Sequence, residues 1–148
     1  MADHYTVACE DPIEDDEIIY RRVRPRDAHK QPDGSYRFGS QAFADRGREP
    51  SVDRARCCSS SEFTRNSPEN GVCSVVATEV RAHRFDQADD KGRPTGTTFV
   101  ADVHRDPLPD NHAHCLVRLH PQKASGSIFK RLLESLARCA KIVLEPPP

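Results

Sequence analysis

The fold class of this chain is decided by the stretch Ser127-Ile128-Phe129-Lys130-Arg131-Leu132-Leu133-Glu134-Ser135-Leu136-Ala137-Arg138-Cys139-Ala140-Lys141. Its apolar residues recur at i, i+1, i+4, i+5, i+8, i+9 and i+12, which places them in one stripe along an amphipathic helix. Most of its charged residues fall outside that stripe. Burial of each large apolar side chain contributes roughly 1.5–3 kcal/mol. We therefore expect the helix to pack across one face of a sheet.

The sequence before and after this helix carries the pattern of short β-strands. The best of them runs from Val72 to Arg81, with apolar residues on both parities, as in a central strand that is covered on both faces. The other expected strands are Ile18–Val23, Tyr36–Phe38, Thr97–His104, His112–Leu119 and Ile142–Leu144. The predicted fold class is α+β: a small, mostly antiparallel sheet with the amphipathic C-terminal helix on one face.

The remaining segments define the domain organisation. Residues 1–15 read as a loose acidic arm, residues 16–145 as a single α+β domain, and residues 146–148 as a proline tail. Within the domain, Ser51 is a candidate N-cap for a short helix from Val52 to Cys58. Pro32-Asp33-Gly34 predicts a turn. The charged stretch 83–96 predicts a surface loop.

Composition excludes several classes of protein. The formal net charge is −1, so the molecule as a whole has no attraction for nucleic acid. A basic, apolar leader is absent from the N-terminus, and no apolar stretch is long enough to cross a bilayer. We therefore expect a cytoplasmic protein that makes no membrane contact. Its six cysteines, with no C-x-x-C pair, are then expected to be reduced thiols.

Charge is divided between two adjacent blocks. Residues 1–20 contain seven acidic side chains and no Lys or Arg, and a basic block follows. The basic block opens with the candidate binding residues Arg21, Arg22, Arg24 and Arg26. These arginines predict a protein partner, with nucleic acid as a minor option. The alternative is that the two blocks neutralise one another or stay solvated.

One polar cluster is a candidate metal site. If the apolar rows of Thr97–His104 and His112–Leu119 both face the core, a symmetric loop places His104 opposite His112 and Asp102 opposite His114. These four side chains suit a divalent metal such as zinc, iron or manganese, and a histidine there suits a general base. The alternative is the solvated side of an antiparallel sheet.

Catalytic signatures are scarce elsewhere in the sequence. Glycine-rich phosphate loops, G-x-S-x-G and H-E-x-x-H are absent from it. The catalytic candidates are therefore single residues: Glu79 as an acid on the best strand, His114 in the polar cluster, and Arg21.

Four short segments carry a resemblance to known proteins. They are Ile19-Tyr20-Arg21-Arg22-Val23, Gly39-Ser40-Gln41-Ala42-Phe43, Pro50-Ser51-Val52-Asp53 and Asn111-His112-Ala113-His114. Together they resemble a group of small bacterial proteins to which no activity is assigned. The resemblance implies a bacterial cytosolic origin and carries over no catalytic residue.

A second resemblance is to NAD-using toxins such as ADP-ribosyltransferases. These place an Arg or His on an early strand, then a Ser and aromatic segment, then a catalytic Glu. Arg21 or Arg22, Ser40 with Phe43, and Glu79 occur in that order, although the E-x-E pair of many such enzymes is missing here.

The sequence favours a non-catalytic accessory or partner-binding module. The alternative is a small enzyme. It would be either a metal-dependent hydrolase or nuclease that uses the polar cluster, or an NAD-using protein like the ADP-ribosyltransferases.

Overall fold

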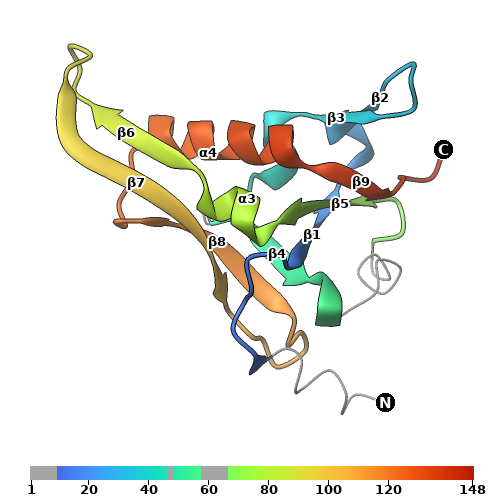
Figure 1. The fold of residues 1–148 in the computed structure, drawn as a ribbon. Coiled ribbons are helices and arrows are strands. Elements are labelled where there is room, and N and C mark those ends of the chain that lie inside the picture. Colours follow the sequence, from blue (N-terminus) through green and yellow to red (C-terminus); the bar gives the residue numbers. More distant parts are fainter. Residues whose placement is uncertain (1–9, 47–48, 58–66) are drawn as a thin grey trace.

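The computed structural model describes residues 10–46, 49–57 and 67–148 (Figure 1). Seven strands form one antiparallel sheet in the order β6-β7-β8-β4-β1-β5-β9. They are β1 (Ile18–Val23), β4 (Ser51–Arg54), β5 (Gly71–Val76), β6 (Arg84–Ala88), β7 (Pro94–Arg105), β8 (His114–His120) and β9 (Lys141–Leu144). Helix α4 (Gly126–Cys139) packs against this sheet. The predicted α+β class is confirmed.

In the described residues, the smaller elements are a second sheet and several short helices. Strands β2 (Ala28–Lys30) and β3 (Tyr36–Phe38) form a two-stranded sheet. The 3-10 helices are η1 (Pro25–Asp27), η2 (Ser40–Phe43) and η3 (Ala55–Cys57), and the α-helix α3 (Ala77–Arg81) follows β5. The turn expected at Pro32-Asp33-Gly34 joins β2 to β3, and Gly34 has a positive φ of 88°.

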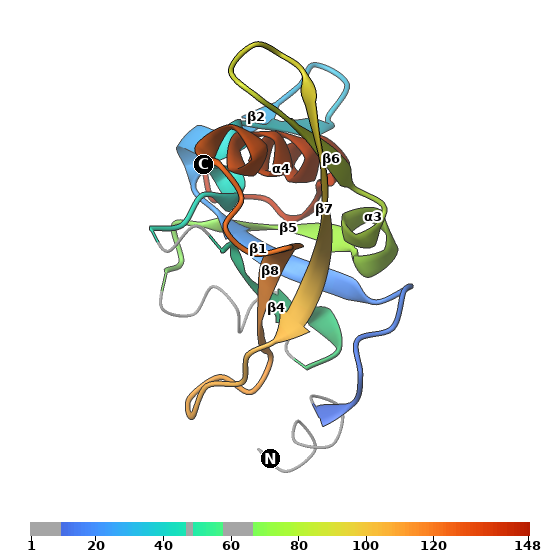
Figure 2. The ribbon, with the colours of Figure 1, turned by 90° about the vertical axis from the view of Figure 1, so that its left-hand side faces the viewer.

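The large sheet is strongly curved. Strands β5 and β6 lie five places apart in it, which is about 24 Å in a flat sheet. Only α3 and two residues connect them, and a five-residue helix is only about 7.5 Å long. The sheet therefore curls until α3 packs against β7, where Arg81 donates to Asp102 at 2.7 Å. Figure 2 shows α3 beside β7 at this closure.

Helix α4 fills the inner face of the curved sheet. The Ser125 side chain caps it by accepting a hydrogen bond from the Ile128 amide at 3.4 Å. One core cluster contains Ile128, Leu132 and Leu136 of this helix together with buried residues of β1, β4, β5, β6, β7 and β8. The amphipathic helix expected over 127–141 is thus confirmed, with its first turn one residue earlier and its end two residues earlier. The strand expected at Ile142–Leu144 follows as β9, paired with β5.

Two predicted elements are wrong in type. The strand expected over Val72–Arg81 ends at Val76, and the chain continues as α3. The helix begins there because the amides of Ala77 and Thr78 donate to carbonyls of the N-terminal segment, at Glu17 and Asp15. The helix expected over Val52–Cys58 is instead β4 followed by η3 in the described residues, with β4 paired on both sides.

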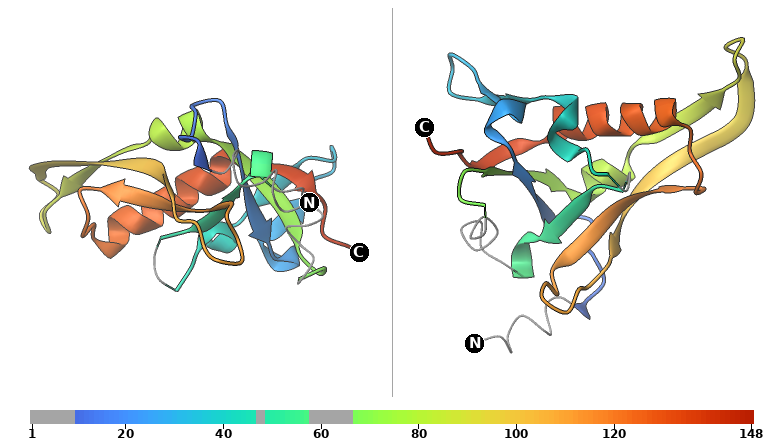
Figure 3. Two further views of the ribbon diagram at one scale, coloured as in Figure 1. Left: turned by 90° about the horizontal axis from the view of Figure 1, so that it is seen from below. Right: turned by 180° about the vertical axis from the view of Figure 1, so that it is seen from behind.

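The stretch 83–96 is also different from its prediction as a surface loop. It forms β6, a tight turn and the start of β7. In the turn, the Asp89 carboxylate accepts hydrogen bonds from the amides of Lys91 and Arg93, both at 2.9 Å. Gly92 there has a φ of 78°. The resulting hairpin projects away from the rest of the sheet in both views of Figure 3.

The N-terminal arm is described only from residue 10; residues 1–9 of the expected arm lie outside the described part. From there on it is bound to the fold: Arg81 donates to the Ile13 carbonyl at 2.8 Å, and Arg54 to the Asp11 carbonyl. No helix in the described part of the chain has the length and apolar content to span a bilayer. Cys73, Cys115 and Cys139 are free, whereas Cys57 is disulfide-bonded, so the expectation of six reduced thiols is wrong at Cys57.

Candidate anion-binding pocket

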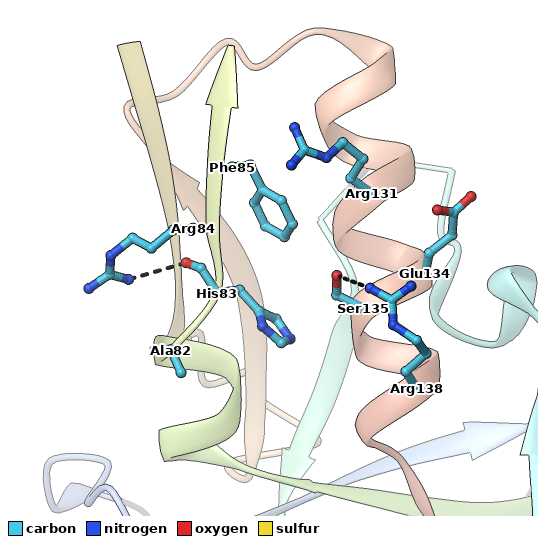
Figure 4. Close-up of a pocket in the computed structure, with 8 residues that line it drawn as sticks. All are labelled: Ala82, His83, Arg84, Phe85, Arg131, Glu134, Ser135 and Arg138. Carbon is cyan, nitrogen blue, oxygen red and sulfur yellow. Dashed lines mark hydrogen bonds between the residues drawn. The ribbon is translucent and has the colours of Figure 1, made fainter. Parts of the chain in front are cut away.

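A pocket of about 500 Å³ lies between helix α4 and strand β6 (Figure 4). Its lining residues come from two short segments: Ala82, His83, Arg84 and Phe85 on one side, and Arg131, Glu134, Ser135 and Arg138 of α4 on the other. Among the described residues, strand β6 is an edge of the sheet and pairs with β7 only, so its second edge bonds no strand there. The pocket therefore combines an open strand edge with one face of a helix.

Three arginines outnumber the one carboxylate, Glu134, among the lining residues, so the lining has a net positive charge. The guanidinium of Arg131 lies 5.3 Å from the centre of the Phe85 ring and donates to the Asp86 carbonyl at 3.2 Å. That of Arg138 donates to the Ser135 hydroxyl at 3.1 Å. That of Arg84 donates to two carbonyls of its own chain segment, the shorter bond being 2.8 Å to Arg81. Figure 4 shows Arg131 and Arg138 on α4, whereas the Arg84 side chain extends from β6 away from the helix.

These three guanidinium groups have no ion-pair partner among the described residues. Their partners are neutral: a ring, a hydroxyl and carbonyl groups. All three residues are exposed to solvent. A guanidinium that bonds only neutral groups keeps donors and its full charge for an external carboxylate or phosphate.

A thiol and an imidazole lie beside the pocket. Cys139 Sγ is 3.8 Å from Nε2 of His83. Burial lowers the pKa of His83, and the positive charge of Arg138 acts in the same direction. Burial also raises the pKa of the Cys139 thiol, as does the charge of Glu79. Both shifts favour a neutral thiol next to a neutral imidazole, which is the opposite of an activated cysteine nucleophile. The arginines therefore make the pocket a candidate anion site, and the thiol and imidazole lack the pKa shifts of an activated cysteine.

The predicted arginine group does not form one surface. Arg21 points to the inner side, where it donates to the carbonyls of Ala42 and Ser51 and pairs with Asp45 at 2.8 Å. Its neighbour Arg22 points to the opposite face, because side chains alternate along a strand. Arg24 and Arg26 are exposed and flank Pro25 at the start of η1.

The candidate acid Glu79 lies on α3 and not on a strand. Its carboxylate accepts a hydrogen bond from the Val76 amide at 3.1 Å, which satisfies a free amide at the start of this helix. Ser40 and Phe43, the other residues of the resemblance to NAD-using toxins, lie on η2. Arg21 is held against η2, with its guanidinium 5.9 Å from the Phe43 ring centre.

The predicted register of the β7–β8 hairpin is wrong by four residues. His104 lies opposite Leu116 instead of His112, and Asp102 opposite Arg118 instead of His114. The loop is not symmetric about Leu108, as the prediction assumes. Leu108 and Asn111 close a tight turn, and the Asp106 amide donates to the His114 carbonyl where the strands begin. More loop residues therefore follow Leu108 than precede it. A slip of four keeps the parity, so the apolar rows still face the core as expected.

The four residues of the predicted metal cluster are therefore separated. Asp102 is held by Arg81, and His104 approaches His120. His112 is exposed in the hairpin loop. The described residues contain no group of three or more His, Cys, Asp or Glu side chains that could hold a metal ion.

His114 belongs to a different group of polar residues. It lies opposite Asp53 in the β4–β8 pairing, and its Nδ1 is 3.1 Å from the Asp106 carboxylate. Asp53 is buried, and its carboxylate accepts from the Asn111 amide at 3.1 Å. Burial raises the pKa of Asp53. This group couples the hairpin loop to β4.

The four segments that carry the resemblance to small bacterial proteins contact one another in the fold. Arg21 of the first donates to Ala42 of the second and to Ser51 of the third. Asn111 of the fourth donates to Asp53 of the third. They meet around strands β1 and β4, away from the α4–β6 pocket.

Sequence reasoning missed the pocket. Apart from Ala82, its residues fall in the stretch expected to be a loop and on the helix outside its apolar stripe. One signal was present: Arg131, Ser135 and Arg138 recur at i, i+4 and i+7, so they share a face of α4. No family model, curated protein or solved structure matches this chain, so the pocket is interpreted from its own geometry.

Proposed function

We propose that this chain is a non-catalytic binding module that captures an acidic, extended segment of a partner protein in the α4–β6 pocket. The observation that carries the proposal is that Arg131 and Arg138 both line the pocket from α4 and that neither has an ion-pair partner among the described residues. Carboxylate groups would supply the bonds that these guanidinium groups lack.

The open edge of β6 supports a polypeptide as the ligand. An extended segment that adds to a strand edge makes main-chain hydrogen bonds, while every second side chain points to the same side. In this pocket such side chains would reach the arginines of α4. A nucleic acid has no equivalent use for the strand edge, and the net charge of the chain is −1.

The test uses a fluorescein-labelled peptide in which glutamate alternates with threonine. We expect wild-type protein to bind it and the Arg131→Gln/Arg138→Gln variant to bind about tenfold more weakly, since an exposed charge pair contributes up to about 1 kcal/mol. Fluorescence anisotropy measures the affinity. The matched control is Arg24→Gln/Arg26→Gln, which removes the same charge from exposed residues outside the pocket.

Two further peptides separate the two parts of the proposal. A glutamine-for-glutamate peptide should bind weakly, because the arginines then have no anion to pair with. A glutamate peptide with N-methylated backbone should also bind weakly, because it cannot add to the edge of β6. Equal affinity in the pocket variant and the wild type, or an equal loss in the Arg24/Arg26 control, would contradict the proposal. Nucleic acid would be favoured instead if a single-stranded oligonucleotide displaces the peptide and if the Arg24→Gln/Arg26→Gln control loses the most oligonucleotide binding.

The location in the cytoplasm and the bacterial origin stay predictions. Disulfides are uncommon in the cytoplasm, so the bond at Cys57 makes the location worth testing by fractionation. The enzymatic alternatives, metal-dependent hydrolysis and NAD chemistry, also stay predictions.

A further inference from the structure

Two histidines meet on the β7–β8 hairpin, far from the residues of the α4–β6 pocket in the sequence. The Nε2 atoms of His104 and His120 are 2.6 Å apart, and their ring centroids are 4.8 Å apart at an interplanar angle of 53°. Both side chains are half-buried. By parity they share the outer face of the sheet with Asp102 and Arg118, which lie directly opposite each other.

Two ring nitrogens 2.6 Å apart need either a shared proton or a cation between them, because their lone pairs repel each other. A neutral imidazole carries one N–H, on either ring nitrogen. No described residue accepts a hydrogen bond from Nδ1 of either ring. If each proton is on Nδ1, both Nε2 lone pairs point at the same place, and a cation there would bind both. Otherwise one ring donates to the other.

The surroundings of His104 favour the form of its ring that a metal ion requires. Burial lowers the pKa of His104, and the charges of His120 and Arg118 act in the same direction, against the opposing charges of Asp102 and Glu49. A lower pKa leaves the imidazole neutral at neutral pH, which is the state that binds metals. The two nearby carboxylates are already paired, Asp102 with Arg81 and Glu49 with Arg118.

We propose that His104 and His120 together bind one zinc ion, with water in the remaining positions. Tetrahedral Zn–N bonds of about 2.0–2.1 Å place two ligand nitrogens about 3.3 Å apart. The rings therefore need to separate by about 0.7 Å from their present distance, which small side-chain rotations at a surface allow. The site has two protein ligands and open positions, unlike a closed structural zinc site. It is independent of the proposed peptide binding.

The experiment is calorimetric titration of zinc chloride into EDTA-treated, full-length protein at pH 7.5. We expect one ion per chain in the wild type and in His112→Ala, a control that removes an exposed histidine of the same hairpin. We expect at least about tenfold weaker binding in His104→Ala and in His120→Ala. Absence of zinc binding in the wild type, or undiminished binding after both substitutions, would overturn the proposal.

A second measurement does not depend on the variants. In the wild type, long-range proton–nitrogen NMR reports the protonation of each imidazole nitrogen, and zinc should shift Nε2 of two histidines together. The proposal is overturned if zinc shifts no Nε2 signal. It is also overturned if the shifted signals are the ones that are missing from the spectra of His112→Ala and His29→Ala. Lowering the pH should weaken zinc binding, because protons compete for the same lone pairs.

Discussion

Arginines are used in opposite ways in the interior of this protein and in the α4–β6 pocket. Arg54 is completely buried, and its guanidinium donates to both carboxylate oxygens of Glu17, with the Nη2–Oε2 bond at 2.9 Å. It also donates to carbonyls of residues 11 and 12. The three pocket arginines are exposed and bond only neutral groups among the described residues.

The difference follows from solvent access. A guanidinium that is taken out of water must find a carboxylate and further acceptors, because an unpaired buried charge is very unfavourable. Arg54 does so and thereby ties the N-terminal segment to β4. A guanidinium that stays in water has no such requirement. The first arrangement serves the fold, and the second leaves charge for a partner.

The largest expected effect comes from breaking the interior pair. Arg54→Ala leaves the Glu17 carboxylate buried without its partner, so we expect a loss of about 3–5 kcal/mol in the free energy of unfolding. Arg56→Ala, two residues later in the sequence, removes an exposed 3.5 Å pair with Asp11 and should cost less than about 1 kcal/mol. Urea unfolding measures both. Similar losses in the two variants would break the comparison.

Asp53 is an intermediate case, a buried acid held by the neutral amide of Asn111. Its pKa is raised by burial from the ordinary value of 3.8. Between that value and the raised one, the folded state holds more protons than the unfolded state, so this residue's contribution to stability falls as the pH rises.

Asp53→Asn removes that titration. We therefore expect the stability difference between the variant and the wild type to shift in favour of the variant as the pH rises through the window above 3.8, and then to become constant. Urea unfolding at a series of pH values measures the shift. A difference that stays flat across this window would show that burial does not destabilise the Asp53 carboxylate.

The smallest effects on stability are expected in the pocket. Arg84→Gln and Arg138→Gln should each change the free energy of unfolding by about 0.5 kcal/mol or less, as for most surface substitutions. Arg131→Gln should cost up to about 1 kcal/mol, because it also removes the contact over the Phe85 ring. Thermal unfolding measures all three. A loss as large as that of Arg54→Ala would mean that the pocket arginines serve the fold.

Elements whose pattern is set by nearby residues were predictable. The apolar stripe of α4 and the β-branched strand β1 lie where the sequence predicts them. The alternating apolar side chains of β7 and β8 also face the core as predicted. The register of that hairpin was not predictable, because slips of two and four residues keep the same parity. The closed turn between Leu108 and Asn111 and the bond between Asp106 and His114 fit only one of these registers.

The candidate site could not be predicted because it depends on a distant contact. Nothing local shows that His83 and Phe85 come next to Arg131 and Arg138, since the curl of the sheet and the packing of α4 bring them together. The same curl turned the end of the expected strand at Val72–Arg81 into α3. His104 was expected to contact His112, and it meets His120 because of the register.

The sequence by itself determined the class of fold, the helix that anchors it, and which side chains face the core. These follow from the period of apolar residues, which is a local property. The tertiary structure decided which polar side chains come together, including the partners of Arg54, the pocket and the histidine pair. Polar contacts depend on register, curvature and chain closure, and these arise only when segments far apart in the sequence pack against one another.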